Sequence, residues 1–350
     1  MASTRMNQPP FEILEKGGPG TQKVTVLDAP FKIRLAYAKM PDAGPGEVRI
    51  KIHYVGICGS DIETYRGTRA PEFISLPTRI GHEAAGVIDE VGKGVIGLRN
   101  GDHVCLRSVW GAFAEYIVCK PFSVQVLPKE LPLIEGSLVE NLPGVINAAE
   151  IGEISPSKNV LIVGQGVSGL IMTQVIARYN PRTLVVTDLF ERKLRLAKSF
   201  GATHTYKIPT PDTPTMDVVK KDFPDGFDVV IPCRLEGDAM VDAIDACAQN
   251  GRIVMYGAIG KCNKPIDFYK VHRKRIDIFS TEPKRDIDAR RLWDEGIRLV
   301  TSGIVNTRDI ITHVVEIEDV DHAFQLRDRP ANDVIHVVIA CNRKDMFPTQ

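Results

Sequence analysis

The pattern of apolar and polar positions changes near the middle of the chain. In the first part, short runs with strand character are separated by glycine-rich turns. The clearest run is Val48-Arg49-Ile50-Lys51-Ile52, which follows a turn at 41–46. Alternation with a period of two is typical of strands that bury one face. Many short strands joined by glycine turns predict a β-rich, barrel-like domain.

After residue 158, apolar runs alternate with helical patterns. Strands are expected at 160–163, 183–187, 227–231, 252–256 and 276–280, and helices at 170–178, 191–200, 238–248 and 288–301. Strands that alternate with helices predict a parallel, doubly wound α/β sheet. The proline- and charge-rich stretch 207–224 is expected to form a surface loop.

The C-terminal part returns to strand character at 333–339, and we expect it to rejoin the first domain. A chain of 350 residues is long enough for two domains with separate cores. We therefore expect a discontinuous, β-rich domain made of residues 1–150 and 303–350. Residues 151–302 are expected to form the α/β domain.

A glycine-rich turn, GQGVSG at 164–169, lies between an expected strand and an expected helix. In a G-x-G-x-x-G turn, Gly164 permits the tight bend, Gly166 lets the main chain approach a pyrophosphate, and Gly169 lets the helix pack on the strand. The free N–H groups where the helix begins, at Val167 and Ser168, and its positive dipole end then face the phosphates. This pattern predicts a dinucleotide site, and an ordinary glycine turn is the alternative.

Asp188 ends the next expected strand. A carboxylate in this place accepts hydrogen bonds from both ribose hydroxyls and repels a 2′-phosphate, so it favours NAD over NADP. Arg192 and Lys193 follow closely and would tolerate a phosphate. A clear preference for NADP in steady-state rates would contradict the NAD assignment.

Cys58, His82 and Glu83 lie in glycine-rich turns of the β-rich part. Thiolate, imidazole and carboxylate are the side-chain classes that zinc accepts, and a catalytic zinc uses three protein ligands with one open position. The alternative is a buried cysteine and an ordinary His-Glu pair.

The charge balance and the cysteine content bear on the binding partners and the cellular compartment of the protein. Lys+Arg and Asp+Glu balance at 44 each, which gives no electrostatic case for binding nucleic acid or an anionic membrane. No apolar run is long enough to cross a bilayer, and the first 18 residues lack the apolar core of a signal peptide. Seven cysteines without a CxxC pair predict reduced thiols and a cytoplasmic location.

Several segments in order resemble the zinc-dependent medium-chain alcohol and polyol dehydrogenases. They are GICGSD at 56–61, GHEAAGVIDEVGKGV at 81–95, GDHV at 101–104 and the glycine turn at 164–169. The segment LVENLPGVINA at 138–148 is similar to the sorbitol dehydrogenase-like branch. The resemblance extends from about residue 23 to 339. It implies a GroES-like barrel domain, a Rossmann domain and a homodimer or homotetramer.

The resemblance also implies roles for single residues. Cys58 and His82 would be zinc ligands, and Glu83 a ligand or a neighbour of the ligands. Glu140 lies where the family places a further ligand or a carboxylate that touches the metal-bound water. Ser60 occupies the proton-relay position; the alternative is a turn serine that caps a main-chain amide.

Five further positions are read from the same resemblance. Lys193 matches a cofactor-facing position, with an exposed helix lysine as the alternative. Glu63 stands where relatives often have histidine, so the proton would leave through Glu63 or directly to water; a solvated surface acid is the favoured interpretation of Glu63. Arg107, Ser108 and Trp110 stand where relatives contribute pocket wall, and an Arg107 that faced the zinc would suit an anionic substrate.

Many relatives carry a second, structural zinc on four closely spaced cysteines after the Gly-Asp-x-Val strand. Residues 104–115 of this chain contain no such cluster, so we expect one zinc per chain. The expected reaction moves hydride between NAD and a secondary alcohol or its ketone in a polyol, sugar or cyclitol, with or without a phosphate or carboxylate. The alternatives are a zinc-free reductase of the same superfamily and a non-enzymatic NAD-binding protein.

Overall fold

The computed structural model describes residues 12–69, 74–234, 237–257, 262–281, 287–329, 331 and 333–342. The chain divides into two compact units. The first unit is Met1–Glu140, Ile311–Pro330 and His336–Gln350, and the second is Asn141–Ile310 and Ala331–Ile335. The expected domain boundaries at residues 150 and 302 stay predictions.

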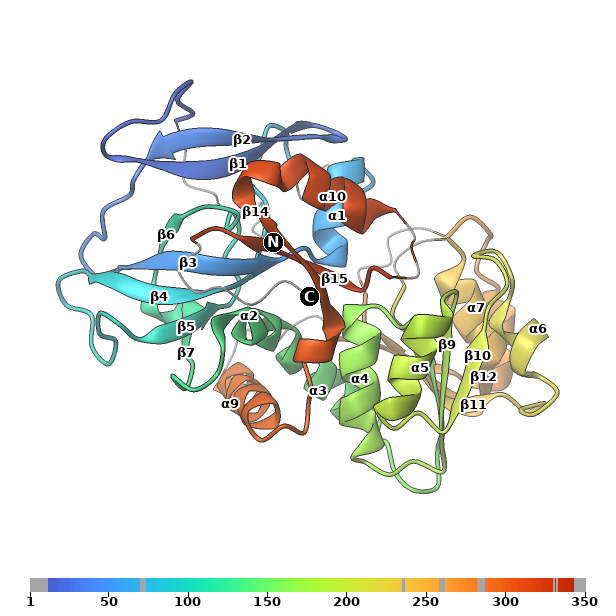
Figure 1. Ribbon diagram of the computed structural model, residues 1–350. Coiled ribbons are helices and arrows are strands. Elements are labelled where there is room, and N and C mark those ends of the chain that lie inside the picture. The colour runs from blue at the N-terminus through green and yellow to red at the C-terminus, as the bar shows by residue number, and fades with distance from the viewer. Residues whose placement is uncertain are drawn as a thin grey trace. The chain divides into compact units, whose positions relative to one another are not determined.

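A seven-stranded sheet forms the centre of the first unit (Figure 1). Its strands are β3 (Val48–Gly56), β4 (Glu83–Val91), β5 (His103–Leu106), β6 (Tyr116–Cys119), β7 (Val124–Val126), β14 (Ile311–Glu316) and β15 (His336–Ala340). The order is β14-β15-β3-β4-β5-β7, and β6 pairs with β3. A separate hairpin joins β1 (Thr21–Ala29) and β2 (Lys32–Lys39). Because β15 pairs antiparallel with β3, the C-terminal strand lies beside the strand that leads to Cys58.

The alternating pattern of β3 is confirmed by its burial. Val48, Ile50 and Ile52 are fully buried, whereas Arg49 and Lys51 are partly exposed on the other face. Each fully buried aliphatic side chain of this size contributes roughly 1.5–3 kcal/mol to folding. This buried face fixes the register of β3 and therefore the position of the loop that follows it.

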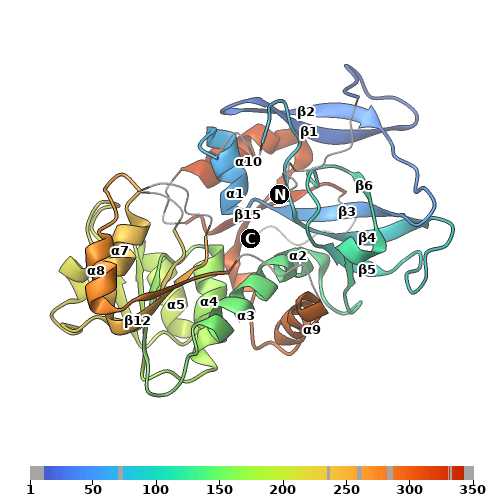
Figure 2. The same ribbon diagram turned by 180° about the vertical axis from the view of Figure 1, so that it is seen from behind.

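Short helices complete the first unit. They are α1 (Gly59–Arg66), α2 (Leu133–Gly136), α10 (Val320–Asp328) and the 3₁₀ turns at Pro121–Ser123, Ser137–Asn141 and Ile317–Asp319. The turn Ser137–Asn141 ends on the first residue of the second unit. Helix α1 was not expected from the sequence, since it is short and has only two large apolar side chains, Ile62 and Tyr65, to bury. It ends at Gly67, whose φ of 71° is the left-handed conformation common at helix C-termini. Helix α10 lies beside α1 in both views, joined by the ion pair of Arg66 and Asp328 (Figure 2).

The second unit contains six parallel strands. They are β8 (Asn159–Val163), β9 (Thr183–Asp188), β10 (His204–Lys207), β11 (Phe227–Pro232), β12 (Cys247–Met255) and β13 (Asp277–Ser280). The order is β10-β9-β8-β11-β12-β13, which is the 3-2-1-4-5-6 order of dinucleotide-binding sheets. β8 and β9 are buried over almost their whole length, as expected for parallel strands covered on both faces.

Helices flank this sheet. They are α3 (Leu142–Ile151), α4 (Val167–Ala177), α5 (Glu191–Ser199), α6 (Thr215–Val219), α7 (Ala239–Ala246), α8 (Phe268–Lys274), α9 (Ile287–Thr301) and a 3₁₀ turn at Arg308–Ile310. Helices α4 and α5 lie in front of the sheet in Figure 1, and α8 lies in front in the reverse view of Figure 2. No helix within the described residues is long and apolar enough to cross a membrane.

The expected surface loop at 207–224 was wrong in part, because it contains α6. The main-chain N–H and hydroxyl of Thr215 donate to the buried carboxylate of Asp242, each over 2.6 Å. Asp242 lies 27 residues further along the chain. A capping residue so far away leaves no local sequence signal.

Candidate metal and nucleotide sites

The expected ligands Cys58, His82 and Glu83 meet at one end of the β3–β4 pair. Glu83 is the first residue of β4 and pairs with Gly56 at the end of β3, so the loops that hold Cys58 and His82 start from neighbouring positions. One ligand atom from each side chain lies within 4.8 Å of the others. His82 and Glu83 are buried, and Cys58 is partly exposed.

Asp61 ties the two ligand loops together. Its Oδ2 accepts a 3.0 Å hydrogen bond from the main-chain N–H of Cys58, and its Oδ1 accepts one of 3.0 Å from the N–H of Gly81. The same Oδ1 lies 3.6 Å from Nδ1 of His82. Asp61 is fully buried, so these contacts are not weakened by water. Sequence analysis missed this role, although the S-D pair after Cys58 was the available signal.

In the metal-free chain, the surroundings shift the pKa values of Cys58 and His82. Burial raises the pKa of the Cys58 thiol, Glu83 adds to this, and His82 opposes it. Burial alone would lower the pKa of His82, but Asp61 and Cys58 outweigh burial and hold this pKa well above its usual value. Both shifts favour the protonated forms of these side chains, so binding of a cation would release protons. The thiolate, imidazole and carboxylate set, gathered within reach of one ion, fits zinc.

Glu140 lies near this group without joining it. It is absent from the trio of mutually close ligand atoms within the described residues. Burial raises its pKa to about 7; His82 opposes this shift, while Glu83 and Asp61 add to it. Glu140 is therefore a carboxyl that exchanges its proton near neutral pH.

His336, on β15, is a second neighbour that the sequence did not indicate. Its Nε2 lies 3.5 Å from Oε2 of Glu83, and the side chain is fully buried. Burial lowers the pKa of His336 to about 4, so the ring is neutral at pH 7. Gly56 makes room for this pair, because a Cβ at that position would lie 2.4 Å from both Glu83 Oε2 and His336 Nε2.

Arg327 places a positive charge near the same group. Burial lowers the pKa of Arg327, and the negative charges of Cys58 and Glu83 oppose this shift. Its Nε is buried and has no hydrogen-bond partner among the described residues. Arg327 thus counters the charge of the trio across space.

Trp110 and Arg69 extend the site outward from His82. The ring centres of His82 and Trp110 are 4.4 Å apart, and the guanidinium carbon of Arg69 lies 5.5 Å from the Trp110 ring centre. Arg107, which we had considered as an anion-binding residue, instead donates through Nε to the main-chain carbonyl of Phe122.

Ser60 and Glu63 lie on α1, directly after Cys58, and both are partly exposed. The Ser60 carbonyl accepts a 2.8 Å hydrogen bond from the hydroxyl of Thr64, which holds the first turn of the helix. The Glu63 carbonyl accepts from the N–H of Thr68 over 2.9 Å. These contacts position the main chain and leave the roles of both side chains as predictions.

The glycine turn of the second unit has the expected backbone. Gly164 adopts a φ of 94°, which favours glycine. A Cβ at Gly169 would lie 2.0 Å from the Gly164 carbonyl oxygen, so the close packing of α4 on the turn requires glycine. A Cβ at Gly166 would meet no described atom within 4 Å, and its φ of −73° suits any residue. Open space in front of Gly166, at the start of α4, suits a pyrophosphate.

Asp188, Ser168 and Lys193 lie around this turn. Asp188 Oδ2 accepts from the N–H of Gln165 over 2.7 Å, and Oδ1 accepts from the N–H of Phe190 over 2.9 Å. Ser168 donates to Asn141 Oδ1 over 3.3 Å, and Lys193 Nζ lies 5.0 Å from the Phe190 ring centre. A carboxylate oxygen has two lone pairs, so Asp188 still has capacity for ribose hydroxyls.

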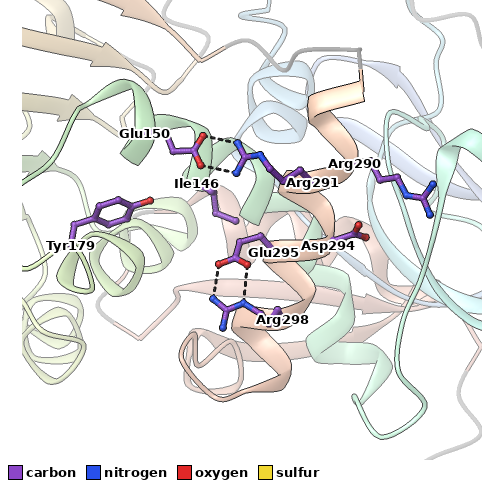
Figure 3. Close-up of a pocket in the computed structure, with 8 residues that line it drawn as sticks. All are labelled: Ile146, Glu150, Tyr179, Arg290, Arg291, Asp294, Glu295 and Arg298. Atoms are coloured by element: carbon purple, nitrogen blue, oxygen red, sulfur yellow. Dashed lines mark hydrogen bonds and ion pairs between the residues drawn. The ribbon is translucent and has the colours of Figure 1, made fainter.

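A hollow of about 620 Å³ on the second unit lies elsewhere. Figure 3 shows its lining residues, drawn from α3, α9 and the segment after α4. Arg291 pairs with Glu150 through two 2.8 Å hydrogen bonds, and Arg298 pairs with Glu295. Its lining contains no cysteine or histidine, and these charges compensate one another. The hollow therefore lacks the thiolate and imidazole ligands that are gathered at Cys58 and His82.

Two family models and several relatives match this chain. Residues 44–129 match the alcohol dehydrogenase GroES-like domain, and residues 168–302 match the zinc-binding dehydrogenase model. The chain is 32% identical to galactitol 1-phosphate 5-dehydrogenase of Escherichia coli K12, with 83% of this chain and 92% of that protein covered. It is 26% identical to sorbitol dehydrogenase of Bacillus subtilis 168, with 93% and 99% covered.

The chain belongs to the zinc-dependent medium-chain polyol dehydrogenase family. A crystal structure of an alcohol dehydrogenase from Escherichia coli CFT073, complexed with NADH, superposes with a TM-score of 0.80 at 23% identity, covering 92% of this chain and 99% of that one. The likeness supports the fold. The expected combination of a GroES-like domain and a Rossmann sheet is confirmed.

Family membership also confirms the expected class of activity and cofactors. The protein is a polyol-type dehydrogenase that uses NAD and zinc. The expected small-molecule alcohol substrate fits this family. The roles of individual residues stay predictions and are developed below.

Proposed function

We propose that this polyol dehydrogenase holds its zinc on Cys58, His82 and Glu83 and oxidises a secondary alcohol of a polyol, sugar or cyclitol. The observation that carries the proposal is the mutual approach of the three ligand atoms within 4.8 Å. Asp61 supports it, because a buried carboxylate that binds both ligand loops preorganises them. Glu140 is a further ligand candidate beside the trio.

The reaction converts the alcohol and NAD⁺ to the ketone, NADH and a proton. When bound, zinc supplies Lewis-acid stabilisation of the negative charge that develops on the substrate oxygen. The hydroxyl of Ser60, two residues after Cys58, passes the alcohol proton outward. Glu140, whose pKa burial raises to about 7 in the metal-free chain, is a second candidate proton carrier beside the trio.

The relay can be tested separately from metal binding. Ser60→Ala should lower the oxidation rate steeply and leave the zinc content unchanged, because it removes a proton carrier and no ligand. Unchanged turnover would contradict the relay. Glu63, three residues further along, is either the next proton carrier or a solvated acid, and Glu63→Gln distinguishes these by its effect on turnover.

The hydride acceptor binds at the turn Gly164, Gly166 and Gly169. The N–H groups of Val167 and Ser168, at the start of α4, face the pyrophosphate, and Asp188 accepts the ribose hydroxyls. Lys193 lies on α5, close to Phe190, and its proposed role is to contact the adenosine ribose. This arrangement favours NAD over NADP.

We also propose a homodimer or homotetramer in the cytoplasm. The assembly rests on similarity to the family, and the compartment is supported by seven cysteines that are all free thiols. Light scattering on the purified protein tests the assembly, and a monomer at micromolar concentration would contradict it.

The function itself is tested by an NAD-reduction screen with metal-quantified protein. The panel contains polyols, sugars, cyclitols and their phosphates. We expect NADH formation with at least one secondary alcohol and its loss after zinc is removed with a chelator. Full activity of zinc-free protein would favour the zinc-free reductase instead.

A further inference from the structure

Arg69 differs in its partners from three exposed or half-buried arginines of the first unit. Arg34, Arg49 and Arg66 are each paired with a carboxylate, on Asp28, Asp89 and Asp328 respectively. Arg69 has no such ion pair among the described residues. Its Nη1 is buried and makes no hydrogen bond there.

The position of this guanidinium is defined by two ring contacts. It lies over the indole of Trp110, and the same indole packs against the ring of His82. A guanidinium that lies over a ring gains a cation–π attraction and keeps its N–H edges available for an acceptor. Arg69 is therefore held in place by Trp110, while no side chain or carbonyl among the described residues bonds its guanidinium edge.

An unused, buried guanidinium N–H is costly. Buried donors nearly always find an acceptor, and one without a partner costs the free energy of its desolvation. A planar guanidinium matches the oxygens of a phosphate or carboxylate, which accept two parallel hydrogen bonds. The missing partner of Arg69 is therefore best supplied by an anionic group of a ligand.

The distance from Arg69 to His82 limits the length of that ligand. The two ring distances together place the guanidinium carbon no farther than about 10 Å from the ring centre of His82. An extended five- or six-carbon polyol with a terminal anionic group spans such a distance. One end of the chain would then reach His82 while the other reaches Arg69.

We propose that the physiological substrate is an anionic polyol or sugar derivative, and that Arg69, supported by Trp110, binds its terminal phosphate or carboxylate. This rests on the proposed function, because it takes His82 as a zinc ligand and the oxidised carbon as bound beside it. Arg69 is a specificity-determining residue and takes no part in hydride transfer. Arg107 is not included in this proposal, since its Nε donates to the main-chain carbonyl of Phe122.

The experiment measures binding by titration calorimetry with zinc-loaded protein in the presence of NADH. The ligands are galactitol 1-phosphate against galactitol, and L-idonate against L-iditol, so that phosphate and carboxylate are compared with neutral chains of matched length. We expect one anionic ligand to bind about 10- to 100-fold more tightly than its neutral counterpart. Arg69→Gln should remove this preference and leave the affinity for the neutral polyol unchanged.

Two further variants guard against a trivial result. Arg34→Gln removes an exposed arginine of the same unit and should retain the preference. Arg69→Lys keeps the positive charge and should recover part of the preference for the anionic ligand that Arg69→Gln loses. A merely structural role of Arg69 would not explain that recovery. The inference is overturned if wild-type protein binds charged and neutral ligands equally, or if Arg69→Gln weakens both alike. NADH formation from these polyols is scored separately and tests the proposed function alone.

Discussion

Asp61 accepts a hydrogen bond from the main-chain N–H of Cys58, so a buried carboxylate outside the ligand set fixes a ligand loop. Because the other oxygen of Asp61 binds Gly81, next to His82, one side chain sets the distance between two proposed ligands. Asp61→Ala should weaken zinc binding about 10- to 100-fold and lower the free energy of unfolding by about 2 kcal/mol or more. Chelator competition and chemical denaturation measure the two effects.

Asp102→Ala is the matched control for that variant. Asp102 also accepts a main-chain N–H, from Arg99 over 2.8 Å, but on the exposed surface. We expect its zinc affinity to equal that of the wild type. Equal zinc affinities for Asp61→Ala and Asp102→Ala would show that Asp61 has no part in the metal site.

Substitution of Gly56 tests the Glu83–His336 contact, because a larger side chain would overlap it. In Gly56→Ala the new methyl group would overlap both side chains, so Glu83 must leave its position. We expect a loss of about 1–3 kcal/mol of stability and a clear fall in zinc affinity. Gly18→Ala, at an exposed position where no described atom lies within 4 Å, should change neither. Wild-type zinc binding by Gly56→Ala would remove Glu83 from the proposed ligand set.

The sequence alone predicted those site residues that stand within short local motifs. Cys58, the His82-Glu83 pair and the glycine turn at 164–169 stand in recognisable local contexts. His336 reaches Glu83 only because β15 pairs with β3 from the far end of the chain, and no local pattern encodes that pairing.

The directions of side chains were the second feature that could not be predicted from the sequence. Sequence analysis considered Arg107 as an anion-binding residue and did not single out Arg69, which has no distinctive neighbour in the sequence. The contact of Arg69 with Trp110 and the bond of Arg107 to the Phe122 carbonyl distinguish the two arginines. These contacts depend on how loops of the first unit return to His82, which periodicity and composition do not determine.

Gly166 and Gly169 should respond differently to the same substitution. Gly166→Ala should fold with wild-type stability, because its Cβ meets no protein atom, but should weaken NADH binding about 10-fold or more by occupying the space of the pyrophosphate. Gly169→Ala should unfold more readily, by about 1–3 kcal/mol, because its Cβ overlaps the Gly164 carbonyl. Fluorescence titration with NADH and thermal unfolding distinguish them. Unimpaired NADH binding by Gly166→Ala would move the cofactor away from this turn.

Glu140 predicts a pH dependence for the metal-free protein. Its pKa is raised from 4.5 to about 7, so the folded state favours the protonated form. The contribution of protonated Glu140 to the stability of the folded state is complete below about pH 4.5 and is lost as the pH rises through 7. Glu140→Gln keeps the neutral form, so relative to wild type it should gain stability between pH 5 and pH 8, by at most about 3 kcal/mol. Denaturation of metal-free protein at both pH values measures this, with the exposed Glu130→Gln as control. A constant difference between Glu140→Gln and wild type would contradict it.

The central claim is that one zinc is held by Cys58, His82 and Glu83. X-ray absorption spectroscopy at the zinc edge of protein with its metal quantified tests it most directly. We predict one zinc per chain, with a single sulfur at about 2.3 Å and the remaining ligands nitrogen or oxygen near 2.0–2.2 Å. In Cys58→Ser that sulfur signal should disappear. A zinc shell without sulfur, a shell with several sulfurs, or an unchanged sulfur signal in Cys58→Ser would contradict the account.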